Sequence, residues 1–168
     1  MLGSYPPSEI LRLLTGLLEE PQEDPILSDV FGLLHFYILR TQQPVSSYQE
    51  SNLVEILLGH CHEKSPMMEK ACEVFRNLTS RSWEYNQLVI ESGAVPILVK
   101  LINDSNIDDC ESPIWILANL AEDNVDKESM IELGITKLLL SKVPSDFLVK
   151  RRLFAYVRPL QTKIAKSI

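Results

Sequence analysis

Residues 91–123 of this 168-residue chain read ESGAVPILVKLINDSNIDDCESPIWILANLAED, and the second half has the spacing of an amphipathic helix. At roughly 100° per residue, the apolar side chains of residues 114–121 share one arc of that helix. The apolar arc consists of Ile114, Ile116, Leu117, Ala118, Leu120 and Ala121, and the opposite arc of Glu111, Ser112, Trp115, Asn119, Glu122 and Asp123. An indole among carboxylates is out of place as core packing, whereas aromatic side chains carry much of the energy at interfaces. The polar arc therefore predicts a contact surface, although a surface tryptophan without a role also fits the pattern.

The segment that begins at Glu91 recurs along the chain. ESGAVPILVK at residue 91 matches ESNLVEILL at residue 50, ELGITKLLL at residue 132 and a fainter copy, EILRLL, at residue 9, so the glutamates stand 41 residues apart. Periods of about 40 to 47 residues are typical of helical solenoids, in which neighbouring units bury one another's apolar faces. We therefore expect an all-α, right-handed α-solenoid without a β-sheet. It should form a single domain over residues 1–168, with about four repeats at about 1–43, 44–81, 82–123 and 124–168.

Helix breakers and caps divide these units into helices. We expect helices over about 7–20, 24–41, 48–61, 65–80, 83–91, 95–103, 112–122, 127–133, 136–142 and from 146 towards the C-terminus. Ser112 followed by Pro113 fits an N-cap with proline at the first helical position. Gly93 and Gly134 are expected to adopt positive φ in sharp turns between helices.

The segments VIESGAVPILVKLI and PIWILANLAED resemble an armadillo repeat, and specifically the repeats of the importin-α (karyopherin-α) family. The third helix of that family's repeat typically reads WALxN, often continued as IAGD, and Trp115, Asn119 and Asp123 fall on its Trp, Asn and Asp without a gap. In the preceding unit Asn77 keeps the asparagine, but Glu73 stands where tryptophan is expected. Arg81 replaces a small residue, usually glycine. The resemblance is close over about 69–123 and weak elsewhere.

The resemblance implies a groove that holds an extended nuclear-localisation peptide. In the family the asparagine amides hold the peptide backbone, the tryptophans clasp the aliphatic stems of its lysines and arginines, and a carboxylate takes the charged head. The corresponding pairs in this chain are Phe36/Arg40, Glu73/Asn77, Trp115/Asn119 and Phe154/Arg158, with Asp123 as a carboxylate. With Glu73 in place of an indole, the slot could attract a cation but would not sandwich its stem. The arginines of the outer pairs would repel a basic peptide.

Three functions remain open at this point. The first is a non-catalytic armadillo scaffold or adaptor that binds a protein partner through its concave groove or a hydrophobic end. The second is a nuclear-import-type adaptor for basic localisation peptides, and the third is an enzyme or nucleic-acid binder. Importin-β binding is not implied, because Arg12 is the one basic residue among the first 20. The chain also has room for only four repeats, far fewer than the family.

Composition disfavours the nucleic-acid hypothesis. The net charge is −7, and residues 1–145 carry ten basic against 22 acidic residues. The calculated pI is about 5.0. An acidic surface would steer a basic peptide towards it, whereas a nucleic-acid surface is expected to be basic. The charges could also simply solvate exposed helix faces.

No catalytic, metal or cofactor site is predicted. Adjacent residues such as His60, Cys61 and His62 point in different directions on a helix, and His35 lies in an apolar run that suggests packing. Phosphate-loop, nucleophile-elbow and HExxH patterns do not occur. The three cysteines have no zinc spacing, which indicates reduced thiols. With neither a signal peptide nor an apolar run of membrane-spanning length in the sequence, we expect a cytoplasmic or nuclear location.

The C-terminal segment has the opposite charge. From Asp146 onward there are six basic residues and one acidic residue, and the basic ones are Lys150, Arg151, Arg152, Arg158, Lys163 and Lys166. We expect this segment to form a separate electrostatic surface on a helix that packs onto the preceding unit. A capping helix whose charges only keep the end of the solenoid soluble is the alternative.

Overall fold

The regular secondary structure in the described part of the chain is entirely α-helical. The computed structural model describes residues 6–20, 23–62, 64–104, 111–123 and 138. Over these residues it contains no strand and eight helices: α1 (Pro7–Glu19), α2 (Asp24–Arg40), α3 (Val45–Glu50), α4 (Leu53–His60), α5 (Met68–Thr79), α6 (Trp83–Glu91), α7 (Ala94–Asp104) and α8 (Glu111–Asp123). The predicted basic segment that begins at Asp146 lies outside the described residues.

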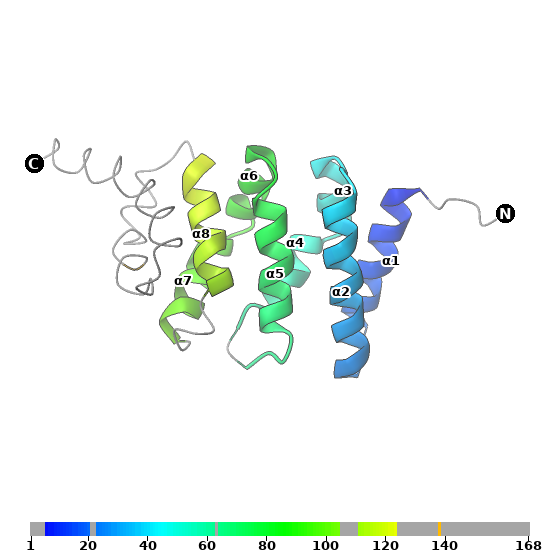
Figure 1. Cartoon of the computed structure of the whole chain (residues 1–168), viewed down its shortest axis with the longest axis horizontal. Helices are drawn as coiled ribbons and strands as arrows, with labels where there is room; N and C mark the ends of the chain where they lie inside the picture. Colours follow the sequence, from blue (N-terminus) through cyan, green and yellow to red (C-terminus); the bar gives the residue numbers. More distant parts are fainter. Residues whose placement is uncertain (1–5, 21–22, 63, 105–110, 124–137, 139–168) are drawn as a thin grey trace, which may run out of the picture.

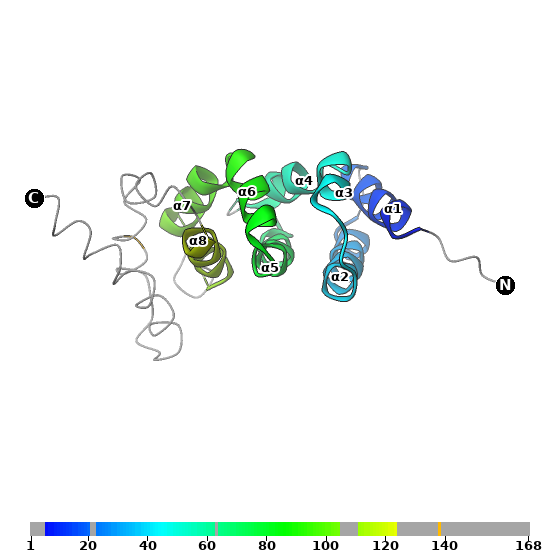
Figure 2. The ribbon, with the colours of Figure 1, turned by 90° about the horizontal axis from the view of Figure 1, so that it is seen from above.

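The helices form two layers that confirm the all-α right-handed solenoid of about four armadillo-like repeats. Figure 1 shows α2, α5 and α8 side by side, and Figure 2 shows them end-on in one row, with α1, α3, α4, α6 and α7 in a second row. Helix α5 packs against both α2 and α8. The groups α1–α2, α3–α5 and α6–α8 fall within the first three predicted units. The fourth unit, 124–168, lies almost wholly outside the described residues, so the division into units stays a prediction.

The core repeats with the sequence. Leu34, Phe75 and Leu117 stand 41 and 42 residues apart, and each is fully buried. The apolar arc predicted around Trp115 is also confirmed, because Ile114, Ile116, Leu117, Ala118 and Leu120 all have exposed fractions of 2% or less. Burying one such side chain contributes roughly 1.5–3 kcal/mol. Each unit thus supplies apolar residues that only a neighbouring unit can cover.

Hydrogen bonds join residues of different units that lie about 40 positions apart. Arg81 donates from Nη1 to the carbonyl of Thr41 at 2.6 Å, and the Tyr85 hydroxyl donates to the carbonyl of Gln43. Arg12 of α1 forms an ion pair with Glu50 of α3 at 2.8 Å. The partners are 40, 42 and 38 residues apart. The two hydrogen bonds help to position the units, whereas the exposed ion pair contributes little to stability.

One expected helix is divided in two. The sequence predicted a single helix over about 48–61, but α3 ends at Glu50 and α4 begins at Leu53. Between them Asn52 has a φ of 52°, and Gly93, 41 residues later, has a φ of 78° as predicted. Asparagine tolerates the left-handed region better than most residues, so it can make the turn that glycine makes in the next unit.

The fainter sequence copy, which begins at Glu9, occupies a different position in its helix from the copies at Glu50 and Glu91. Glu50 and Glu91 are the last residues of α3 and α6, whereas Glu9 lies in the first turn of α1. Helix α8 begins at Glu111, one residue before the expected Ser112, which is within the usual uncertainty of helix ends.

The N-terminal end of the stack is apolar. The exposed residues there are Ile10, Leu13 and Leu17 of α1 and Ile26 and Leu33 of α2. The ion pair of Arg12 with Glu50 marks the side of α1 that faces the next unit. At 100° per residue, Ile10 and Leu17 lie on the opposite side of α1. They therefore occupy a face that a preceding unit would cover in a longer solenoid.

Candidate functional site

The row of helices α2, α5 and α8 presents one face of the stack, which we call the α2–α5–α8 face; it is polar on α5 and α8, whereas α2 exposes Phe36 and Leu39. On α5, Phe75 and Leu78 point into the core, while Glu69 and Ser80 on the opposite side are exposed. Glu73 and Asn77 share that opposite side of α5 and are partly exposed. The polar arc of α8, which includes Trp115 and Asn119, continues this face.

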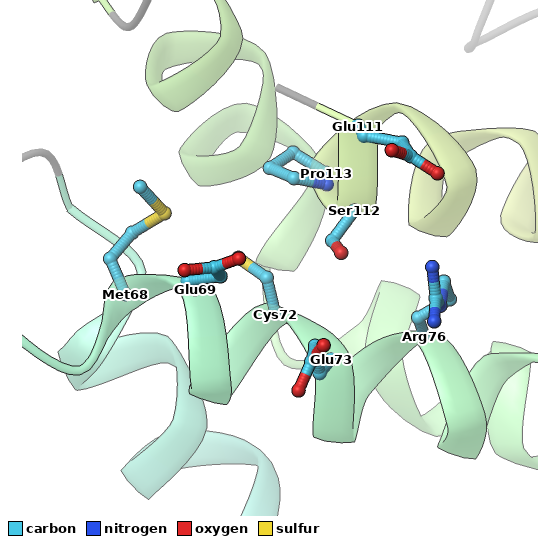
Figure 3. A pocket seen from close by; sticks show the side chains of 8 residues that line it. All are labelled: Met68, Glu69, Cys72, Glu73, Arg76, Glu111, Ser112 and Pro113. Carbon is cyan, nitrogen blue, oxygen red and sulfur yellow. The ribbon is translucent and has the colours of Figure 1, made fainter. Parts of the chain in front are cut away.

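A pocket of about 140 Å³, the acidic pocket, lies between α5 and α8 (Figure 3). Its charged lining residues are Glu69, Glu73 and Arg76 from α5 and Glu111 from α8. Figure 3 shows Arg76 reaching towards α8, with the carboxylates distributed on both helices. No ion pair joins Arg76 to these carboxylates in the described residues, and three carboxylates outnumber one guanidinium. The pocket can therefore attract a cationic side chain.

Trp115 is not among the residues that line this pocket, but it is close to them along α8. It follows Glu111 by four residues, which places both on the same side of α8. Its side chain is partly buried, so the structure places it neither in the core nor fully in solvent. Asn119 follows one turn later on the same side. Asp123 ends α8, and its side chain lies outside the described residues.

Both predicted asparagines contact the neighbouring helix of the face. Asn119 donates from Nδ2 to Oγ1 of Thr79 at 3.1 Å, and Nδ2 of Asn77 lies 3.0 Å from Nδ1 of His35. Sequence reasoning assigned these amides to a peptide backbone and missed Thr79 and His35 as their partners. The available signal was a polar residue 40 or 42 positions earlier, one repeat period back. A carboxamide has two N–H donors and a carbonyl oxygen, so one lateral bond leaves capacity for a ligand.

A second cavity, the arginine pocket, lies between the C-terminal ends of α2 and α5 and has a volume of about 740 Å³. Its charged lining residues are Arg40 and Arg81, and its remaining lining residues are uncharged. Burial raises the pKa of the Tyr85 hydroxyl in its wall, and the positive charge of Arg81 partly opposes this rise. The α2–α5–α8 face thus carries a negative pocket and a positive pocket.

Phe36 and Arg40 contact each other. The guanidinium carbon of Arg40 lies 5.1 Å from the centroid of the exposed Phe36 ring. The sequence alignment of the repeats made Phe36 the equivalent of Glu73. A repeat shift of 41 residues, which aligns the buried Leu34 with the buried Phe75, makes Phe36 the equivalent of Asn77 instead. The other outer pair, Phe154 and Arg158, lies outside the described residues.

In the His60–His62 stretch, His60 and Cys61 contact neighbouring side chains of the protein. His60 packs edge-on against Phe31 with ring centroids 5.2 Å apart, and its Nδ1 lies 3.3 Å from the Ser65 hydroxyl. The sulfurs of the buried Cys61 and Cys72 are 3.8 Å apart. The hydrogen bond with Cys72, followed by burial, raises the pKa of the Cys61 thiol, which makes it a poor nucleophile. The described residues contain no cluster of three or more potential metal ligands.

The described helices also contain no span long and apolar enough to cross a membrane. No family model matches the sequence. Among curated proteins, the chain is similar to importin subunit alpha-6 of Arabidopsis thaliana, with 23% identity over 117 residues, which are 68% of this chain and 22% of that protein. It is also similar to importin subunit alpha-1b of Oryza sativa subsp. japonica, with 36% identity over 63 residues, or 37% of this chain and 12% of that protein. The matches thus span less than a quarter of these relatives.

Solved structures agree on the fold. A designed armadillo repeat protein matches with a TM-score of 0.73 and 20% identity, covering 88% of this chain and 63% of the designed chain. A second designed armadillo repeat protein, solved in complex with the peptide (KR)4, matches with a TM-score of 0.70 and 21% identity, covering 89% and 64%. Together with the sequence matches, these likenesses show that the chain has an armadillo-repeat fold and is similar in sequence to part of importin-α.

Proposed function

We propose that this chain is a non-catalytic scaffold or adaptor that binds an extended segment of a protein partner across the α2–α5–α8 face. The observation that carries the proposal is the acidic pocket, which is lined by carboxylates of both α5 and α8, with Trp115 one helical turn beyond Glu111. An aromatic anchor beside a polar pocket is the kind of contact that dominates protein interfaces. The designed armadillo neighbour solved with (KR)4 supports a peptide as the partner.

In this proposal each site residue has a distinct role. Trp115 contacts the aliphatic stem of a lysine or arginine, and Glu73 binds its charged head with Glu69 and Glu111. Asn77 and Asn119 use the second amide N–H and the carbonyl oxygen on the partner's backbone. Asp123 would extend the acidic surface, and Phe154 and Arg158 would extend the row of contacts. Nucleic acid, membranes and importin-β are not proposed as partners, and we propose a cytoplasmic or nuclear location.

A second candidate is a nuclear-import-type adaptor that binds basic localisation peptides. The acidic pocket favours it, because three carboxylates suit a lysine side chain. Glu73 in the place of a second tryptophan and the positive charges of Arg40 and Arg81 weigh against it. The two candidates therefore differ in whether the bound segment is uniformly basic.

The test is a titration of a fluorescent lysine-rich peptide against the whole chain, followed by anisotropy. Trp115→Ala should weaken binding by about 2 kcal/mol, or about 30-fold. Trp83→Ala is the matched control, because Trp83 is 59% exposed on α6 in the other layer and should leave binding unchanged. Equal effects of the two variants would refute the assignment of the face. Undetectable wild-type binding at millimolar peptide would reject the localisation-peptide candidate.

A further inference from the structure

We infer that the arginine pocket is a subsite for a carboxylate, so that the bound segment carries an acidic side chain as well as a basic one. This inference rests on the proposed function, because it places a second contact on the same α2–α5–α8 face. The partner it fits is an extended peptide of mixed charge. Aspartate or glutamate of that peptide enters between α2 and α5, while lysine or arginine enters between α5 and α8.

Each of the two guanidinium groups has a contact within the protein before any ligand arrives. Arg81 is anchored by its 2.6 Å hydrogen bond to the Thr41 carbonyl, and Arg40 is stacked over the Phe36 ring. A guanidinium has five N–H donors in a fixed fork that matches a carboxylate, so one hydrogen bond leaves Arg81 with donors to offer. Groups that are already ordered lose less conformational entropy when a ligand binds.

Within the described part of the chain neither arginine of this pocket forms an ion pair, and the negative charge that acts on its wall is that of Glu84 on Tyr85. The ion pair found in the described residues joins Arg12 to Glu50, and no described carboxylate pairs with Arg40 or Arg81. The pocket is lined by both arginines and otherwise by uncharged residues, including Asn77 and Ser80, which face it from α5. A volume of about 740 Å³ accommodates an acidic side chain with its backbone.

Helix geometry gives the spacing between the two subsites. Glu73 and Arg81 are eight residues apart, which corresponds to about 12 Å when the helical rise of α5 is continued to Arg81, two residues past its end. The two pockets also lie on opposite sides of α5, about one interaxial distance of 8–10 Å apart. The resulting separation is about 15 Å, which four or five residues of extended chain can span.

Capping of the helix ends is the alternative role for these arginines. Arg40 lies in the last turn of α2, where a cation is favourable, and Arg81 bonds the residue that caps α2. Arg81 is therefore partly structural. Arg40 is the better probe, because it is exposed and its described contact is the one with Phe36.

The experiment is a double-mutant cycle on the whole chain with two peptides. One peptide has lysine and glutamate five residues apart, and the other has glutamine in place of the glutamate. Wild type should bind the glutamate peptide about tenfold more tightly, since hydrogen bonds to charged groups are among the stronger ones. The net charge of −7 would by itself favour the glutamine peptide, so a preference for glutamate indicates a local positive site.

Arg40→Ala should abolish the tenfold preference, whereas the control Arg12→Ala, an exposed arginine on α1, should preserve it. Equal binding of both peptides to wild type, or a preference that survives Arg40→Ala, would overturn the carboxylate subsite. If Trp115→Ala still weakens binding in that case, the proposed function stands. If wild type binds neither peptide at millimolar concentration, both the subsite and peptide binding on this face are rejected.

Discussion

Replacing Tyr48 by phenylalanine should stabilise the protein. Tyr48 lies on α3 with no exposed surface, and its hydroxyl makes no hydrogen bond within the described residues. Its ring packs edge-on against Tyr85, with centroids 5.4 Å apart and an interplanar angle of 81°. Phenylalanine keeps the ring contact and removes only the unpaired hydroxyl. An unsatisfied buried hydroxyl costs about 1–3 kcal/mol, so we expect a gain in unfolding free energy of about 1 kcal/mol.

Tyr85→Phe is the matched control, because the Tyr85 hydroxyl donates to the carbonyl of Gln43. Its loss should lower the unfolding free energy by about 1 kcal/mol. Urea denaturation followed by far-UV circular dichroism measures both changes. A Tyr48→Phe variant that is less stable than wild type would refute the reasoning, since it would mean that the hydroxyl has a partner.

Tyr48 also determines part of the pH dependence of stability at alkaline pH. Burial raises the pKa of Tyr48 to about 12 from a usual value of 10.0. Because the folded pKa lies above the unfolded one, stability is full below pH 10 and falls as the pH rises from about 10 to about 12. Tyr48→Phe should remove that part of the alkaline loss. Between pH 9 and pH 11 wild type should therefore lose more unfolding free energy than Tyr48→Phe does, and urea denaturation at the two pH values measures both losses.

Three further predictions concern stability. Val74→Ala should lower the unfolding free energy by roughly 2 kcal/mol because Val74 is fully buried. Leu33, 41 residues earlier, is 58% exposed, so Leu33→Lys should change the unfolding free energy by less than about 0.5 kcal/mol. Equal losses in urea denaturation would contradict the exposure of the apolar N-terminal end of the stack. Asn119→Ala should lower unfolding free energy by about 1 kcal/mol through loss of the Thr79 bond, and an unchanged urea midpoint would show that the bond contributes nothing. Burial, and secondarily the charge of His62, lowers the pKa of His60, so its neutral form is favoured on folding; stability should fall as the pH drops below about 6.5, and His60→Gln should flatten that decline in thermal melts.

Periodicity predicted most of the fold, because the buried faces of armadillo-like helices repeat in the sequence itself. The apolar arc around Trp115 and the turn at Gly93 both follow from local pattern. Asn52 was missed for a physical reason. Its left-handed φ places it at the equivalent of Gly93, but asparagine signals such a turn less strongly than glycine does. A continuous apolar spacing across residues 48–61 therefore concealed the break between α3 and α4.

The candidate site was only partly predictable. The sequence placed Trp115, Asn119, Glu73 and Asn77 on one face, and the structure brings them to the same row of helices. The lateral bonds of the two amides and the arginine pocket depend on how units stack, which local spacing does not encode. Their partners lie about one repeat away, at a distance along the chain where side-chain length and small register shifts decide which atoms meet.

Helix electrostatics explains part of the charge on this face without a ligand. Glu69 and Glu111 lie in the first turns of α5 and α8, and Arg40 lies in the last turn of α2, where each charge favours its own helix. Glu73 does not fit that explanation, because it lies mid-helix, beyond the reach of the helix-end effect, and still lines the acidic pocket. The helix-end effect therefore gives no reason for a carboxylate at this position of α5, and neither Lys70 nor Arg76, three residues away on either side, forms an ion pair with it in the described residues. A cationic side chain bound next to Trp115 does give one, which makes Glu73 the charge on which the peptide-binding interpretation most depends.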